Sequence, residues 1–513
     1  MFRNLTDTLT HPAALPVIGI LLLVILVFLT LSVVSPETKP RKRQFSDNPM
    51  MNALGWAGVI LALPGLAILI AAGWELIVLA WNYPPLNTKA SEIRWHSSIM
   101  LAMLAAIGAI FTLVFAYIRS FATERQTRAT EESLFNDKIN AAADDLHARR
   151  QVTKSPDEKD NHWDYWQDDI VRRNAAIDRL EGLAIERPDI APRIARMLSI
   201  YVRELSAENL PQVVPKRETP RVVPKEPSPQ NLTNWMGRLS AIRSDMENAA
   251  QTLGRLPKID GVESAKVDVD LRRANLQGFA LHGLTFDQAQ MQGAEMQSAY
   301  LHKAKMKGAD LLEAKMQRAD LRKAQMQGAS LSWTQMQEAD LSGTQMQGAV
   351  LIRAQMQKAS LGGAQMQGAV LSGAQMQRAV LSGAQMQRAS LSGAQMQNAN
   401  LMGAQMQGAI LSKAQMQGAS LNGAKLQGAV LSEAQMDSAT SLREAIFSGA
   451  ALREVDYSDV SISQAQVDEL FYDGSVTFAE GITRAPGRDE VLDWGDFDTQ
   501  WRAWQKKNGY EVE

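Results

Sequence analysis

The sequence predicts an all-β solenoid joined to a region of N-terminal transmembrane helices, with a small α-helical segment between them. Two observations carry this prediction. A five-residue unit, Ala-x-(Leu/Met)-x-x, fills the 170 residues from Val269 to Ser438, which makes 34 consecutive units. Residues 1–118 instead contain three long apolar stretches. The chain of 513 residues therefore combines regions of different class.

The five-residue period favours extended backbone over an α-helix. On a helix, five steps of about 100° would turn each Leu or Met roughly 140° from the last, so no apolar stripe would form. Within one unit the pattern alternates instead, with Ala364 and Met366 on one side and Gln365 and Gln367 on the other. Because one such unit cannot bury its own apolar side, the array predicts a solenoid of stacked copies.

The array from Val269 to Ser438 resembles the pentapeptide repeat family. The resemblance implies a right-handed quadrilateral β-helix with four units per coil, in which the small Ala and the large Leu or Phe of the family point inward. Positions 20 apart should then stack into four columns, which contain Leu311, Leu321, Met306 and Met316. With about 4.8 Å between coils, the array would form a rod roughly 40 Å long.

The Met columns and the outward Gln residues suggest two interpretations. Met could form a soft metal site or a promiscuous groove. We instead expect each Met to fill a slot where the family places an inward Leu or Phe, and the Gln amides to bond along the rod. Thr334 and Thr344 should point inward in this register.

The end of the array is marked by a one-residue slip of phase near Ser441. Apolar pairs then resume as far as Tyr457, and Ser463–Phe471 predicts a short helix. The tail beyond it contains three tryptophans, which predict either a segment packed on the last coil or a partner-binding tail: Trp494, Trp501 and Trp504.

The N-terminal region predicts three membrane-spanning helices, at about 13–34, 54–81 and 97–118. The first stretch is too long for the apolar core of a secretory signal. Glu75, near the end of the second span, is predicted at the headgroup level or, alternatively, as an intramembrane functional carboxylate.

Basic residues predict the orientation of these helices. They crowd the first loop and the segment after the third span: Lys39, Arg41, Lys42, Arg43, Arg119, Arg125 and Arg128. The positive-inside rule then places both segments in the cytoplasm and the N-terminus outside. The predicted location is the bacterial inner membrane, with the repeat domain in the cytoplasm.

Five further segments follow the membrane region. In Asp164–Leu205 a helical hairpin is predicted, in which Ile177, Leu180, Leu183 and Ile185 would share one buried face. The predicted segments are a juxtamembrane and hairpin region at 119–205, a Pro-rich linker at 206–230, a capping helix at 231–268, the repeat β-helix at 269–462, and a C-terminal cap and tail at 463–513.

Three short stretches resemble bacterial pentapeptide repeat proteins that carry N-terminal membrane spans. They are 123–128 after the last span, 173–180 in the hairpin and 249–255 before the repeats. Asn174-Ala175-Ala176 stands where that family has Gly-Gly. The resemblance implies a bacterial membrane protein and implies no defined activity.

No catalytic, cofactor-binding or metal-binding residues are predicted. The chain has no Cys, which excludes disulfides and thiolate chemistry. His282 and His302 should stack one coil apart, but no third or fourth metal ligand is evident beside them. The paired carboxylates lie in charged helices, where a solvated face is the expected role.

The charge of the array argues against DNA mimicry, by which some members of this family bind gyrase. A mimic needs an acidic rod. Residues 269–438 instead contain 15 Lys and Arg against 10 Asp and Glu, a net charge of +5. Leu341–Ser432 has six basic residues and no carboxylate, which is also too weak a basic footprint for nucleic-acid binding.

These observations predict a membrane-anchored, non-enzymatic scaffold whose rod contacts protein partners. The alternative is a membrane sensor or transport accessory protein in which the transmembrane helices carry the activity. The expected partners are unidentified proteins and the lipid bilayer, with a homo-oligomer left open.

Overall fold

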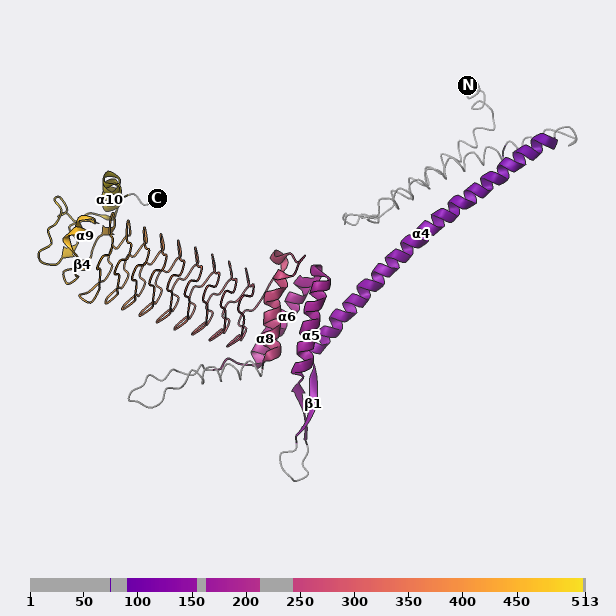
Figure 1. The fold of residues 1–513 in the computed structure, drawn as a ribbon, viewed down its shortest axis with the longest axis horizontal. Helices are drawn as coiled ribbons and strands as arrows, with labels where there is room; N and C mark the ends of the chain where they lie inside the picture. Colours follow the sequence, from indigo (N-terminus) through magenta and orange to yellow (C-terminus); the bar gives the residue numbers. More distant parts are fainter. Residues whose placement is uncertain (1–73, 75–89, 155–162, 213–242, 511–513) are drawn as a thin grey trace, which may run out of the picture. The chain divides into compact units, whose positions relative to one another are not determined.

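The computed structural model describes Trp74 and residues 90–154, 163–212 and 243–510 (Figure 1). The chain divides into two compact units between Asn136 and Asp137. The first described helix, α4 (Ala90–Leu146), has residues in both units. The second unit contains a helical subdomain and the coiled array, and it is the unit in which the candidate sites lie.

The array forms a four-sided solenoid, as the sequence predicted. Each coil pairs in parallel with the next at four positions, and the paired residues lie 20 apart, as in Gln345 with Gln365 and Val350 with Val370. Around each bridge the backbone bonds repeat: Leu351 N–H donates to Val370 O at 2.7 Å, and Val370 N–H donates to Ala349 O at 2.9 Å. Figure 1 shows these coils stacked between α8 and α10.

The interior of the rod is filled by the predicted columns. Ala364, Met366, Ala369 and Leu371 are fully buried, and the same holds at equivalent positions along the array. The methionines are therefore core residues, and each such side chain contributes about 1.5–3 kcal/mol as an upper estimate. The two inward threonines satisfy their hydroxyls locally; that of Thr334, for example, donates to Leu331 O at 2.7 Å.

The corners of each coil are four-residue turns. Ala374 N–H donates to Leu371 O at 3.0 Å, and Gly373, the third residue of that turn, has a φ of +66°. A single left-handed residue at this position is the signature of a type II turn, which favours Gly. Arg353 and Arg378 adopt left-handed φ values of +55° and +59° at equivalent corners, at a cost of about 1–2 kcal/mol each.

The side chain of Asp437 accommodates the one-residue slip in the repeat near Ser441. Ser420 pairs with Ser441, so the spacing becomes 21 residues. The extra residue interrupts the regular ladder, and Gly418 N–H donates to Asp437 Oδ1 at 2.8 Å instead of to a backbone carbonyl. The Thr440 hydroxyl and Ala439 N–H also donate to that oxygen. These backbone and hydroxyl donors hold the pKa of Asp437 below its ordinary value.

The helical subdomain precedes the rod. It contains α5 (Ile170–Glu186), the 3-10 turn η1 (Pro188–Ile190), α6 (Ala191–Glu208) and α8 (Ser244–Arg255). Before α5 lies an antiparallel hairpin of β1 (Arg149–Lys154) and β2 (Trp163–Asp168), which the sequence analysis missed. The first three residues of the predicted linker, 206–208, belong to α6, and residues 213–242 lie outside the described part.

The buried face of α5 differs from the prediction at one position. Ile177, Leu180 and Leu183 are buried, but Ile185 is 62% exposed. At about 100° per residue, Ile185 lies roughly 80° from Ile177 around the helix, whereas Ala184 lies within about 20° of it and is the residue that is buried. Including Ile185 in the buried face was therefore wrong.

The first coil is closed by α6 and α8. Its four outward N–H groups each find an acceptor: Asp270 at Ser199 Oγ, Asn275 at Ser206 Oγ, Ala280 at Glu247 Oε1 and Thr285 at Gly254 O. Carbonyls of the same edge accept from Arg243, Gln251 and Lys258. The capping helix predicted at 231–268 thus appears as α8, assisted by α6.

The last coil is closed by α9 (Gln464–Asp468), by four two-residue strands and by α10 (Trp494–Asn508). The strands extend the ladder: β3 (Ala451–Leu452) pairs with β5 (Phe471–Tyr472), and β4 (Asp456–Tyr457) pairs with β6 (Thr477–Phe478). The helix predicted at Ser463–Phe471 is therefore shorter than expected, because Phe471 lies in a strand.

The tail packs on the rod, which was the first of the two predicted alternatives. Phe497 and Trp501 of α10 form a buried cluster with Ala451 and Phe471. The indole N–H of Trp501 donates to Gly449 O at 2.8 Å.

No helix in the described part of the chain is long and apolar enough to cross a membrane. The predicted spans at 13–34 and 54–81, with Glu75, lie outside the described residues except for Trp74. Residues 97–118 are helical within α4, where many side chains are not described. The membrane anchor stays a prediction.

Replacing an inward Met should destabilise the rod far more than replacing an outward one. We expect Met366→Ala, at a fully buried position, to cost about 2–5 kcal/mol, because it leaves a cavity. Met402→Ala, at a side chain 52% exposed, should cost less than about 0.5 kcal/mol. Urea unfolding followed by far-UV circular dichroism measures both, and equal midpoints would contradict inward stacking.

The stability of the phase-slip loop should depend on pH. A depressed pKa stabilises the fold above the unfolded-state value of 3.8, and that stabilisation is lost as the pH falls through the folded-state pKa. Asp437→Asn should therefore be less stable than the parent protein near neutral pH, and the gap should close on acidification below about pH 4. Melting curves from pH 7 to 2 measure this, with Asp459→Asn, on an exposed turn, as control.

Candidate functional site

Two opposite walls of the rod are lined by amides. Their outward bridge positions are Gln325–Gln405 on one wall and Gln335–Gln435 on the other, at every twentieth residue. The Gln at the following corner donates its Nε2 to the bridge Gln of the next coil, 18 residues on, as in Gln347 to Gln365 at 2.7 Å. The amides therefore bond along the rod, as predicted, but on a diagonal between two positions rather than within one column.

The third wall is polar and carries ion pairs near its N-terminal end. Its outward positions include Asp320, Asp340, Ser360 and Asn400. The Arg322 guanidinium pairs with Asp320 at 2.6 Å and holds the pKa of that carboxyl below its ordinary value. This wall therefore offers charges of both signs in its first coils and hydroxyl and amide groups later.

The fourth wall is different, because aliphatic side chains occupy most of its outward positions in the later coils. These positions are Ser330, Val350, Val370, Ser390, Ile410 and Val430. The rod therefore presents two amide walls, one polar wall and one partly aliphatic wall.

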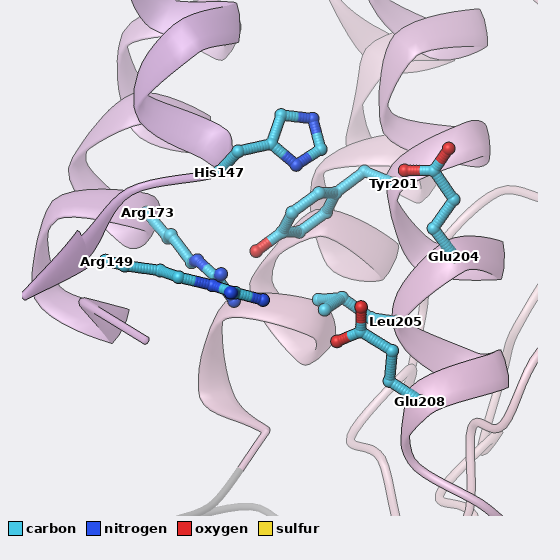
Figure 2. A pocket seen from close by; sticks show the side chains of 7 residues that line it. All are labelled: His147, Arg149, Arg173, Tyr201, Glu204, Leu205 and Glu208. Atoms are coloured by element: carbon cyan, nitrogen blue, oxygen red, sulfur yellow. The ribbon is translucent and has the colours of Figure 1, made fainter. Parts of the chain in front are cut away.

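A polar pocket of about 210 Å³ lies in the helical subdomain (Figure 2). Its lining comes from the residue after α4, from β1, and from α5 and α6: His147, Arg149, Arg173, Tyr201, Glu204, Leu205 and Glu208. Figure 2 shows the two guanidinium groups extending side by side toward the Tyr201 hydroxyl. The sequence did not single out this pocket, since its residues come from separate elements.

The floor of the pocket is a buried network. The Tyr201 hydroxyl donates to Asp245 Oδ2 at 2.7 Å, and Arg173 Nη1 lies 3.5 Å from the same oxygen. Arg173 also pairs with Asp168 at 2.8 Å and donates from Nε to Ala148 O at 3.2 Å. Burial lowers the pKa of Arg173, but the oxygens of Tyr201, Asp168 and Asp245 more than offset this, so the guanidinium stays charged.

This network is suited to holding helices together rather than to catalysis. Burial, followed by the neighbouring Asp245 carboxylate, raises the pKa of Tyr201 well above its ordinary value, so the phenol stays protonated and cannot serve as a general base near neutral pH. Arg173 uses its three nitrogens on protein acceptors. His147, Arg149, Glu204 and Glu208 are exposed around the mouth and combine both signs of charge. The network joins β2, α5, α6 and α8.

The two histidines considered as metal ligands do lie one coil apart, because Gly283 N–H donates to His302 O at 2.8 Å. His282 is exposed and His302 half-buried. Within residues that the structure describes, no group of three or more His, Cys, Asp or Glu side chains is placed to hold a metal ion.

Comparison with known protein families matches the array to a single type of sequence repeat. A profile described as Pentapeptide repeats matches eight copies between residues 267 and 459, which implies a right-handed quadrilateral β-helix. A search of curated proteins gave no significant match.

Several solved structures resemble the rod at low overall similarity. QnrB1, a plasmid-mediated fluoroquinolone resistance protein, is 17% identical, with 38% of this chain and 90% of that chain covered and a TM-score of 0.25. HetL, from the cyanobacterium Nostoc sp. strain PCC 7120, is 27% identical, with 35% and 89% covered and a TM-score of 0.17. Both TM-scores are below 0.5, so neither likeness carries an argument about function.

The buried network should be needed for the helical subdomain to stay closed. Arg173→Met leaves Asp245 without its cation and should cost about 3–5 kcal/mol. The adjacent Arg172→Met, at a side chain mostly exposed and paired with Asp145, should cost less than about 1 kcal/mol. Hydrogen exchange of α8 amides measures the difference. Equal protection in the two variants would show that the network does not hold α8.

Proposed function

We propose that this chain, which matches the pentapeptide repeat profile within residues 267–459, is a non-enzymatic scaffold that presents its rod to protein partners. The observation that carries the proposal is the contrast between the interior and the walls. The inward columns are filled by Ala, Leu, Met and Thr, with Val269, Phe279 and Phe286 in the first coils, so the rod interior has no room for a substrate. The walls are regular rows of amide, hydroxyl and aliphatic groups.

Rigidity supports a scaffold role. The walls are fixed by backbone bonds at four positions per coil and by amide bonds along two walls. A preorganised surface of this kind avoids much of the entropy cost of ordering side chains on binding. Both ends of the rod are capped, which keeps it from adding further coils edge to edge.

The membrane anchor is part of the same proposal. Described side chains in the predicted third span include Leu101, which is 74% exposed, and Phe115 and Ile118, which are also exposed. Such apolar side chains on the surface of a single helix are suited to lipid contact. Arg119, Arg125 and Arg128 lie within α4 directly after the predicted third span, and this placement supports a cytoplasmic rod at the bacterial inner membrane.

A second candidate function, a membrane sensor, is favoured by one observation. Helix α4 runs without a break from residues of the predicted third span to Leu146, one residue before His147 of the polar pocket. In this alternative the rod has a regulatory role and the predicted helices, with Glu75, carry the activity.

Site-specific photo-crosslinking in intact cells separates these functions. With a photoreactive residue at outward rod positions such as Gln365 or Ser372, we expect crosslinks to other proteins, because these side chains line the walls. The same residue at Leu101 should instead crosslink to lipid. Samples kept in the dark are the control. Protein crosslinks from the N-terminal region, with none from any wall, would favour the sensor.

A further inference from the structure

An aliphatic stripe, defined here as Val350, Val370, Ile410 and Val430, runs along the fourth wall of the rod. These residues occupy four of five successive outward bridge positions in one column, and Ser390 occupies the middle one. Ile410 is 43% exposed, and the others are half-buried by their neighbours. With about 4.8 Å between coils, the stripe is roughly 19 Å long.

The rod does not need these residues for its own stability. On the opposite wall the corresponding outward positions hold Asp340, Ser360, Asn400 and Ser420, and that wall carries the same backbone ladder. Val380 is the aliphatic exception there. Within the fourth wall itself, serine at 330 and 390 fits the ladder equally well. The stripe therefore needs an explanation other than coil stacking.

The C-terminal helix shows what this wall can bind. Beyond Val430, the same column of outward positions continues through Ala451 and Phe471. Both are buried beneath Phe497 and Trp501 of α10, and Val430 packs at the edge of this cluster. An amphipathic helix with an aromatic face thus already covers the end of the column as far as Val430. Val350, Val370 and Ile410 are the uncovered continuation of the same surface.

Charge along the stripe favours an acidic partner. Arg353 lies at one edge of the wall and Arg388 at the other, and residues 341–432 contain no carboxylate to neutralise them. Lys413, on the edge that holds Arg353, pairs instead with Glu433 at 3.4 Å. The Arg353 guanidinium stacks on the exposed Trp333 ring, 4.8 Å from its centroid, which adds an aromatic surface at the start of the stripe. Helix α10 itself carries Asp496 and Asp498 near its aromatic residues.

We propose that the aliphatic stripe binds, from a partner protein, an amphipathic helix that has an aromatic face and flanking carboxylates. The inference rests on the proposed scaffold function and names the wall and the kind of partner. A helix of about 10 residues, at 1.5 Å per residue, matches the roughly 14 Å from Val350 to Ile410. The apolar side chains give affinity, and the flanking cations orient the helix.

The test uses the purified full-length chain and a fluorescein-labelled peptide with the sequence of residues 492–510 as the probe. The variant combines Val350→Ser, Val370→Ser and Ile410→Ser, which should fold because serine occupies position 390 of the same column. Val380→Ser, on the opposite wall, is the matched control. By fluorescence anisotropy we expect the Kd of the probe to rise at least tenfold in the triple variant and to stay unchanged in the control.

Several outcomes would overturn the inference. These are no binding to the parent chain, equal binding by the triple variant, an equal loss in Val380→Ser, or equal binding of a scrambled peptide. Sedimentation velocity gives a further one: self-association of the parent chain that the triple variant abolishes would make the stripe an interface between copies. Partner crosslinks from other walls that survive in the triple variant would overturn the stripe while leaving the scaffold function intact.

Discussion

The structure depends on the backbone ladder between successive coils. Each coil donates and accepts at four positions, with a spacing of 20 residues. This ladder forces a small residue and a larger apolar residue inward on every side, and it forces a left-handed residue at each corner. It also leaves an unpaired edge at each end, and an exposed edge is a template for aggregation.

Both edges are closed by side chains rather than by further coils. At the first coil, Ser199, Ser206 and Glu247 accept from three of the four outward N–H groups, and Gly254 O accepts from the fourth. The buried Arg243 donates to two carbonyls there, and burial lowers its pKa to about 10. Because α6 and α8 supply these groups, the helical subdomain and the rod are one structural unit.

The repeat could be predicted from sequence because a single rule governs it. Alternation within five residues located every inward side chain, including the methionines and Thr334. Two features could not be predicted without the three-dimensional structure. At the phase slip, the Asp437 carboxylate accepts the hydrogen bond that a backbone carbonyl accepts elsewhere in the ladder. The residues of the polar pocket come from elements that are separate in the sequence. The prediction for Ile185 was wrong because the angle around the helix decides burial: Ile185 lies roughly 80° from Ile177, and the small Ala184 takes the buried position.

The sequence of the rod contains three periods, of 5, 10 and 20 residues, and the aliphatic stripe belongs to the third. The core requires a period of five, because every side of the coil needs an inward pair. The amide walls follow a period of ten, which places Gln on opposite sides of a four-sided coil. A third period, of 20 residues, distinguishes the fourth wall from its opposite. Aliphatic side chains occupy most outward positions of the fourth wall, at Val350, Val370, Ile410 and Val430. Polar side chains occupy those of the opposite wall, at Ser360, Asn400 and Ser420. Neither inward packing nor the amide ladder requires that distinction, so its physical consequence must lie outside the rod.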